Sequence, residues 1–204
     1  MIHVLDYGLG NVQAFLTMYR RLGFEAIHAK TAGDLAGAQK IILPGVGAFD
    51  HAMELLNQSN IRTTLEALIL YDKVPVLGIC VGMQILASFS DEGHLPGLGW
   101  VPGNVRAFRT NAQCSNLPLP HMGWNDVQPM PGSPLFAGLE SDPRFYFLHS
   151  YYFECEDPSH VAASAAYGFD FSCGVNVGNV YGVQFHPEKS HHFGAQLLKN
   201  FADL

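Results

Sequence analysis

Basic residues are scarce in this sequence of 204 residues. It contains 11 Lys and Arg against 18 Asp and Glu, which gives a formal net charge of −7. Proteins that bind the phosphate backbone of DNA or RNA take their affinity from clustered Lys and Arg. The composition therefore argues against a nucleic-acid partner.

Long hydrophobic runs are also absent. No stretch reaches the roughly 18 uncharged apolar residues that a membrane-spanning helix requires. The first eleven residues, MIHVLDYGLGN, have neither the basic start nor the long apolar segment of a secretory signal. We therefore expect a cytoplasmic protein that does not interact with a membrane.

Cysteine is rare, and its spacing does not fit the usual cysteine clusters. The four cysteines include no C-x-x-C pair, which argues against a disulfide framework and a thiolate zinc site. They are Cys80, Cys114, Cys155 and Cys173. The adjacent His191 and His192 point in different directions on a helix and lack the spacing of a zinc-binding helix. We expect no metal.

A nucleotide-binding fingerprint is missing as well. The stretch YGLGNV (7–12) follows a predicted strand and is similar to G-x-G-x-x-G, but it lacks the third glycine and no Walker lysine follows. It is interpreted as a strand-to-helix turn, and we expect no cofactor.

The first ninety residues alternate buried-looking strands with segments of helical periodicity. Residues 11–23 carry apolar side chains near 3.6-residue spacing, and Gly23 is placed to end that helix. Continuous apolar strands separated by helices imply a parallel sheet covered on both faces. Strands are predicted at 2–6, 24–29, 40–44 and 74–79, and the other helices at 32–38, 48–57, 62–72 and 81–89.

Shorter, alternating strands follow residue 98. The two-residue turn Gly178-Asn179 predicts a hairpin, and residues 191–204 predict a final helix. The fold class is therefore α/β, with a mostly parallel central sheet flanked by helices and an antiparallel extension. With no linker or repeat, residues 1–204 are expected to form one domain. The predicted strands are 105–108, 124–129, 144–155, 161–167, 172–177 and 180–185.

Cys80 stands between two glycines where a predicted central strand meets a helix, in LGICVGMQILAS (77–88). Open α/β sheets bind ligands at such strand ends. The glycines suit a sharp turn like the G-x-S-x-G nucleophile elbow, with sulfur in place of oxygen. A helix N-terminus would favour the thiolate. Cys80 is therefore a candidate nucleophile.

Two further stretches fall at predicted strand ends. In GVQFHPEKS (182–190), an extended chain would place His186 and Glu188 on the same side, so that Glu188 could orient and stabilise His186 as a base for the thiol. The glycines of PGVGAF (44–49) could free backbone N–H groups to face a developing oxyanion.

Each stretch also has a purely structural interpretation. G-x-C-x-G alone is typical of a tight turn with a packed cysteine, His-Pro occurs at many strand ends, and PGVG alone is a loop. The conjunction of all three at one edge of one sheet favours a Cys/His/Glu active site.

Six motifs, in their order and spacing, make the chain resemble the class I, or triad-type, glutamine amidotransferases. PHMGWN in particular is similar to the glutaminase subunits of imidazole glycerol phosphate synthase in the histidine pathway. The resemblance covers nearly all of the chain and implies a flavodoxin-like amidotransferase fold. The motifs are DYGLGN (6–11), PGVGAF (44–49), GICVGMQ (78–84), LPHMGWN (119–125), FYFLHSY (145–151) and GVQFHPEKS (182–190).

The resemblance implies a reaction as well as a fold. Cys80 would attack the carboxamide of glutamine, and backbone N–H groups of Val46 and Val81 would hold the oxyanion. His186, supported by Glu188, would protonate the departing ammonia, and water would then hydrolyse the thioester. Position 81 is Val where the family usually has Leu, which leaves the backbone donor unchanged. The residues implied around the bound glutamine are Gly45, Gly47, Gln84, His149, Ser150 and Tyr151.

The family also implies a partner. It is a (β/α)8-barrel cyclase, bound as a heterodimer, to which ammonia passes without meeting solvent. Trp124 could instead be ordinary strand packing, and Lys189 a solvated charge. The residues expected on the docking face are Asn11, Met122, Trp124, Asn125 and Lys189. We further expect the oxyanion loop to depend on the partner for its active conformation.

Three hypotheses about function follow. The first is a glutaminase that supplies ammonia for imidazole glycerol phosphate formation. The second is a paralogous glutaminase that supplies ammonia for amidine formation on an N-acetyl sugar in surface-polysaccharide biosynthesis. The third is a binding module without activity, because the fold alone permits any of them.

Overall fold

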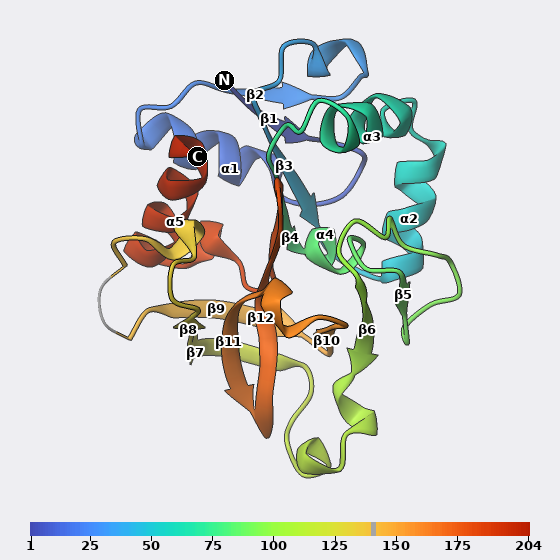
Figure 1. The fold of residues 1–204 in the computed structure, drawn as a ribbon, viewed down its shortest axis with the longest axis vertical. Helices are drawn as coiled ribbons and strands as arrows, with labels where there is room; N and C mark the ends of the chain where they lie inside the picture. Colours follow the sequence, from blue (N-terminus) through green and yellow to red (C-terminus); the bar gives the residue numbers. More distant parts are fainter. Residues whose placement is uncertain (140–141) are drawn as a thin grey trace.

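The parallel strands form the centre of the molecule. A computed structural model describes residues 1–139 and 142–204, and its main sheet runs in the order β2-β1-β3-β4-β13-β12-β10-β6-β5 (Figure 1). From β2 to β13 all neighbours are parallel. These strands are β1 (Ile2–Leu5), β2 (Ala26–Ala29), β3 (Lys40–Gly45), β4 (Val76–Cys80) and β13 (Val180–Val183).

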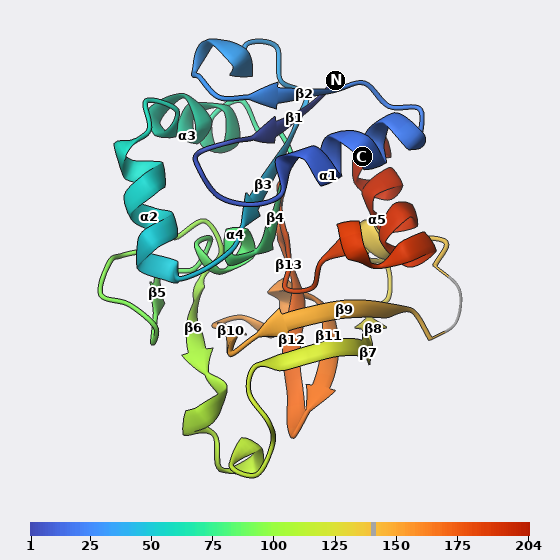
Figure 2. The ribbon, with the colours of Figure 1, turned by 180° about the vertical axis from the view of Figure 1, so that it is seen from behind.

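Helices cover both faces of this parallel part. In Figures 1 and 2, α1 and α5 lie against one face, and α2 and α3 against the other. Each presents buried apolar side chains to the sheet. The predicted α/β architecture is thus confirmed. The helices are α1 (Val12–Arg21), α2 (Phe49–Gln58), α3 (Arg62–Leu70), α4 (Val81–Gln84) and α5 (His191–Asp203).

The second half of the chain extends the sheet with antiparallel pairs. β12 pairs with β13 around Gly178-Asn179, as predicted, and also with β10 and β11. A separate two-stranded sheet, β7 with β9, crosses beside it (Figure 2). These strands are β5 (Phe89–Ser90), β6 (Gly103–Ala107), β7 (His121–Asp126), β8 (Gln128–Pro129), β9 (Arg144–His149), β10 (Tyr151–Cys155), β11 (Val161–Tyr167) and β12 (Phe169–Val177).

Two helix predictions are wrong in extent. The helix expected over 32–38 is a short 3-10 turn, Gly33–Leu35. The helix expected over 81–89 ends at Gln84, because the carbonyl groups of residues 85–87 accept hydrogen bonds from the N–H groups of Leu98, Gly99 and Val101 instead of continuing the helix. A segment distant in sequence therefore overrides the local helical pattern.

None of the helices in the described part of the chain is long and apolar enough to cross a membrane.

His3 is an exception to the apolar interior. It lies on β1, is fully buried, and neither ring nitrogen has a hydrogen-bond partner among the described residues. Burial and the nearby N-terminal ammonium lower the pKa of this imidazole, against weaker raising effects of the Met1 backbone and of Asp34. An unpaired buried polar group costs about 1–3 kcal/mol, so His3 destabilises the fold.

We predict that His3→Leu raises the free energy of unfolding by about 1–2 kcal/mol at pH 7. The difference in the free energy of unfolding between His3→Leu and the wild type should increase toward pH 5. An unfolded histidine titrates near pH 6.5 and the folded His3 titrates lower, so protons favour the unfolded wild type as the pH falls. Chemical denaturation at both pH values measures this. His51→Leu, at an exposed position on α2, is the control. Equal stability of wild type and His3→Leu at both pH values would contradict the prediction.

Candidate active site

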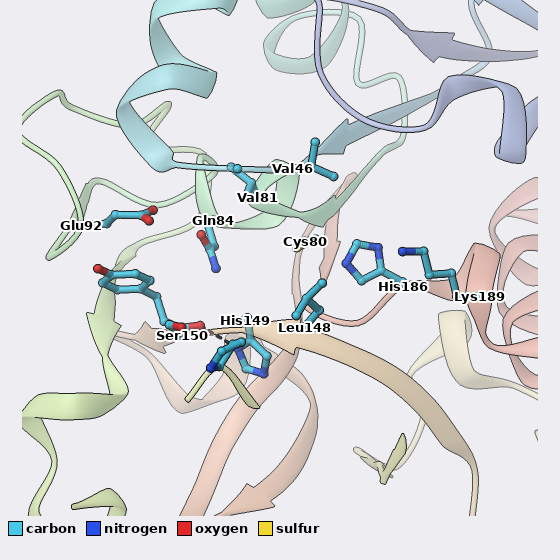
Figure 3. Close-up of a pocket in the computed structure, with 13 residues that line it drawn as sticks. Val46, Cys80, Val81, Gln84, Glu92, Leu148, His149, Ser150, His186 and Lys189 are labelled. Atoms are coloured by element: carbon cyan, nitrogen blue, oxygen red, sulfur yellow. Dashed lines mark hydrogen bonds between the residues drawn. The ribbon is translucent and has the colours of Figure 1, made fainter. Parts of the chain in front are cut away.

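A cavity of about 310 Å³ opens at the C-terminal ends of β3, β4 and β13. This is the sheet edge at which the sequence placed its three candidate stretches, and residues of all three line the cavity. Figure 3 shows Val46 and Val81 on one side of Cys80, His186 and Lys189 on another, and Leu148, His149 and Ser150 on a third. The remaining lining residues are Gly47, Gln84, Glu92, Pro120 and Tyr151.

Cys80 forms a strained elbow between β4 and α4. Its backbone has φ 56° and ψ −114°, a conformation that residues other than glycine rarely adopt. A Cβ at Gly82 would lie 2.0 Å from the carbonyl oxygen of Leu43, and one at Gly78 would lie 2.5 Å from that of Gly82. Both glycines are therefore required for α4 to pack on β3 and β4. The elbow directs the sulfur into the cavity, although Cys80 is only 5% exposed.

His186 and Glu188 form a buried pair. Nδ1 of His186 donates to Oε1 of Glu188 at 2.9 Å, and both side chains are almost inaccessible to solvent. Residues Pro187–Lys189 form a 3-10 turn and are not extended, so the expected backbone conformation is wrong while the predicted contact between the side chains is present. Glu188 occupies Nδ1, which leaves Nε2 for the hydrogen bond between His186 and Cys80.

The charges in this cluster stabilise one another. Burial by itself lowers the pKa of His186, but hydrogen bonds and charges from Cys80 and Glu188 outweigh it and raise the pKa to about 9. An imidazolium beside the sulfur favours the thiolate. The helix dipole expected to assist is minor, because α4 spans only four residues.

The opposite wall forms where the chain changes sheets. β9 pairs with β7 and ends at His149, and β10 pairs with β6 and β12 and begins at Tyr151. The strand predicted over 144–155 is thus two strands in different sheets. His149, Ser150 and Tyr151 line the cavity at this break, as do Gln84 and Gly47. Gly45, the remaining residue expected near glutamine, is buried at the end of β3 and does not line the cavity.

A hydrogen-bonded pair of histidines supports this wall. His149 donates from Nδ1 to the Tyr151 carbonyl at 2.8 Å, so its Nε2 accepts from Nδ1 of His121, also at 2.8 Å. Nε2 of His121 in turn accepts from Nδ2 of Asn125 at 3.2 Å. Burial lowers the pKa of His149 to about 3 and that of His121 to about 4, so both rings are neutral. His121 was not among the site residues predicted from the sequence, although alternation along PHMGWN would have placed it inward.

Glu92 is a second site residue that was not predicted from the sequence. It lines the cavity, and its Oε2 accepts the N–H of Phe49 at 2.8 Å. Burial raises the pKa of this carboxyl, against the lowering effect of the Phe49 hydrogen bond, and Asp50 raises it further. Glu92 follows the short strand β5, and no local motif marks it.

Of the residues expected on the docking face, Lys189 lines the cavity, and Met122 lies beside Leu148, which also lines it. Met122 is 64% exposed on β7 and pairs with Leu148 on β9, and Trp124 stacks on His191 at 5.3 Å. Lys189 lies 5.9 Å from the centre of the Tyr146 ring. Asn125 is half-buried. Asn11 is exposed at the start of α1, where it accepts a hydrogen bond from Ala14 N–H, and it borders a separate pocket with Glu188.

Among residues 1–139 and 142–204, no group of three or more His, Cys, Asp or Glu side chains could hold a metal ion.

Comparisons with known proteins agree with the geometry. A family model described as "Glutamine amidotransferase class-I" matches residues 3–204. The chain is 64% identical to "Imidazole glycerol phosphate synthase subunit HisH" of Bdellovibrio bacteriovorus and 52% identical to that of Leptospira interrogans, in both cases over all of each chain. A solved structure titled "Crystal structure of glutamine amidotransferase" matches with a TM-score of 0.77 at 20% identity, covering 99% of this chain and 97% of that one.

We predict that iodoacetamide modifies Cys80 about tenfold faster, or more, than the other three cysteines at pH 7.5, because only Cys80 combines an imidazolium neighbour with access to the cavity. Burial raises the pKa of Cys114 and Cys173, and that of Cys155 to about 11. Peptide mass spectrometry of a time course measures the four rates. Cys80→Ser should abolish the fast phase. Equal rates would contradict the assignment of the nucleophile.

Proposed function

The chain belongs to the glutamine amidotransferase class-I family, and we propose that the cavity around Cys80 is its glutaminase site. Subunits of imidazole glycerol phosphate synthase match it over its full length, up to 64% identity among the relatives described above. The chain is accordingly a glutaminase of histidine biosynthesis that acts in a complex with another subunit. The alternative acceptor, an N-acetyl sugar, is not favoured. The observation that supports the site is that Cys80 and His186 line one cavity together, while Glu188 pairs with His186 from behind.

In the first half-reaction the thiolate of Cys80 attacks the side-chain carboxamide carbon of glutamine. The carbonyl oxygen becomes an oxyanion, for which the backbone N–H groups of Val81 and Val46 are the proposed donors. His186 then gives its Nε2 proton to the nitrogen as the C–N bond breaks. Ammonia leaves, and a γ-glutamyl thioester remains on the sulfur.

In the second half-reaction the neutral His186 takes a proton from water. The hydroxide attacks the thioester and the C–S bond breaks, which restores the thiolate and the imidazolium. The new γ-carboxyl group gives its proton to solvent, and the product is glutamate. Glu188 keeps the ring in the tautomer that presents Nε2 to the substrate throughout.

Glutamine must also be held by its α-amino and α-carboxylate groups. Among the described residues that line the cavity, Glu92 is the only one with a carboxylate, and it lies across the cavity from His186 (Figure 3). We propose that it binds the α-ammonium group. Gln84, Gly47 and the His149–Tyr151 segment are proposed to contact the rest of the substrate.

The proposed partner is a (β/α)8-barrel cyclase, bound as a heterodimer. The support is the exposed apolar surface beside the cavity, where Met122, Trp124 and Leu148 lie on β7 and β9. Aromatic and methionine side chains are enriched at interfaces. Ammonia released beside Lys189 and Leu148 would then enter the partner without meeting solvent.

The decisive experiment measures glutamate release by the chain mixed with the cyclase subunit of the same organism, with and without the cyclase's ribonucleotide substrate. We expect strong activation by the cyclase and its ligand, because Val46 lies in an exposed loop that must supply an oxyanion donor. Cys80→Ala should abolish the release. Full activity of the isolated chain would contradict the dependence on the partner, and activity in Cys80→Ala would contradict the site.

We predict that Glu92→Gln raises KM for glutamine by about ten- to a hundredfold with a smaller change in kcat, since a charge-assisted hydrogen bond made in both ground and transition states is lost. Glu54→Gln, on the exposed side of α2, is the matched control and should leave both constants unchanged. A loss confined to kcat would assign Glu92 to the chemistry instead of to binding.

The pH profile provides a further prediction. His186 must carry a proton to expel ammonia, and its pKa is raised to about 9. We therefore expect kcat to stay high through neutral pH and to fall as the pH rises through about 9. His121 and His149 titrate far lower and should add no step near pH 6.5. A fall in kcat on the alkaline side beginning at pH 7 would be inconsistent with this assignment.

A further inference from the structure

The buried side chain of Gln184 connects the nucleophile to a substrate contact. Gln184 follows β13, is fully buried, and lies two residues before His186. Its Nε2 donates to Sγ of Cys80 at 3.7 Å, and its Oε1 accepts from Nε2 of Gln84 at 3.0 Å. Its backbone N–H donates to the carbonyl of Cys173 on β12 at 2.9 Å, which fixes the main chain from which the side chain projects.

We propose that Gln184 is a positioning residue that holds the sulfur of Cys80 for attack and, at the same time, sets the orientation of the Gln84 amide toward glutamine. The proposal deepens the proposed function and rests on it. Gln184 does not line the cavity and would not touch the substrate.

The polarity of the two amides follows from the charge on sulfur. A thiolate only accepts hydrogen bonds, so the NH₂ end of Gln184 must face Cys80. The carbonyl end then faces Gln84, which must donate a hydrogen bond to it from its own NH₂ group. Oε1 of Gln84 is thereby left for the cavity, as an acceptor for an N–H group of bound glutamine. The two amides therefore have one consistent arrangement while Cys80 is ionised.

The other groups around the sulfur do not supply this function. His186 faces Cys80 as the proton carrier. The buried hydroxyl of Tyr7 donates to the Pro44 carbonyl at 2.8 Å, and its pKa is raised by burial and, to a lesser extent, by the charge on Cys80. The Gln184 amide is thus a donor to sulfur that takes no part in the proton transfers. Its removal should change the reactivity of the sulfur and the contact with the substrate, while His186 remains as the base.

Two variants separate the two contacts. Gln184→Met keeps the side-chain length and removes both the donor and the acceptor. Gln184→Glu keeps an oxygen that accepts from Gln84 but presents no N–H group to the sulfur. Gln196→Met is the matched control, because Gln196 is a half-buried glutamine on α5 that donates to Asn200 away from the cavity.

The first measurement is the rate of iodoacetamide modification at Cys80 from pH 5 to 10 in the full chain, followed by peptide mass spectrometry. The loss of a hydrogen bond to a charged acceptor should make the thiolate less stable, which slows alkylation about tenfold at neutral pH. Both Gln184 variants should show this, whereas Gln196→Met should match the wild type.

The second measurement is glutamine hydrolysis in the activated complex. Gln184→Met should raise KM about tenfold and lower kcat, whereas Gln184→Glu should lower kcat with KM near the wild-type value, because only the latter keeps the acceptor for Gln84. Thermal melting identifies variants that do not fold. If Gln184→Met does not fold, Gln184→Glu alone decides the donor function.

The proposal would be overturned if Gln184→Met folded and showed the wild-type alkylation rate and the wild-type KM. It would also be overturned if both variants raised KM equally. Either result leaves the proposed function standing, because wild-type Cys80 would still react selectively and release glutamate. Failure of wild-type Cys80 itself would instead overturn the proposed function. The two outcomes are therefore distinguishable.

Discussion

The close approach of α4 to β3 and β4 is the constraint on which the site depends. Neither Gly78 nor Gly82 has room for a Cβ atom, since the contacts at both positions are with backbone atoms that cannot move aside. Their absence of side chains lets the chain turn sharply, and the strained φ of Cys80 is the result. The thiol is thus fixed at the C-terminal edge of the parallel sheet, where His186 and the loop after β3 can reach it.

The chain's change of sheets at Ser150 has a comparable role on the opposite wall. The backbone leaves the β7–β9 pair and joins the main sheet within one residue, which places a short segment of loop beside the nucleophile. The neutral pair His121 and His149 supports this segment from behind and extends to Asn125 near the exposed surface. The proposed glutamine pocket and the proposed docking face therefore share one strand pair.

The donors and acceptors of the reactive groups fix one another's orientation. Glu188 determines which nitrogen of His186 faces the sulfur, and the sulfur determines which end of Gln184 faces it. The charge that favours the thiolate comes from the imidazolium, because the four-residue α4 has only a small dipole. Each buried polar group of this cluster thus constrains the next.

The sequence by itself determined the alternation of strands and helices, the elbow at Cys80 and the hairpin at Gly178-Asn179, because these depend on local periodicity and on glycine at particular positions. Tertiary structure decided the rest. Residues 85–88 leave the helix because N–H groups of residues 97–101 bind their carbonyl groups. Glu92 and Gln184 acquire roles only through neighbours far away in the chain. Such contacts between distant segments leave no periodic pattern, so only the folded chain reveals them.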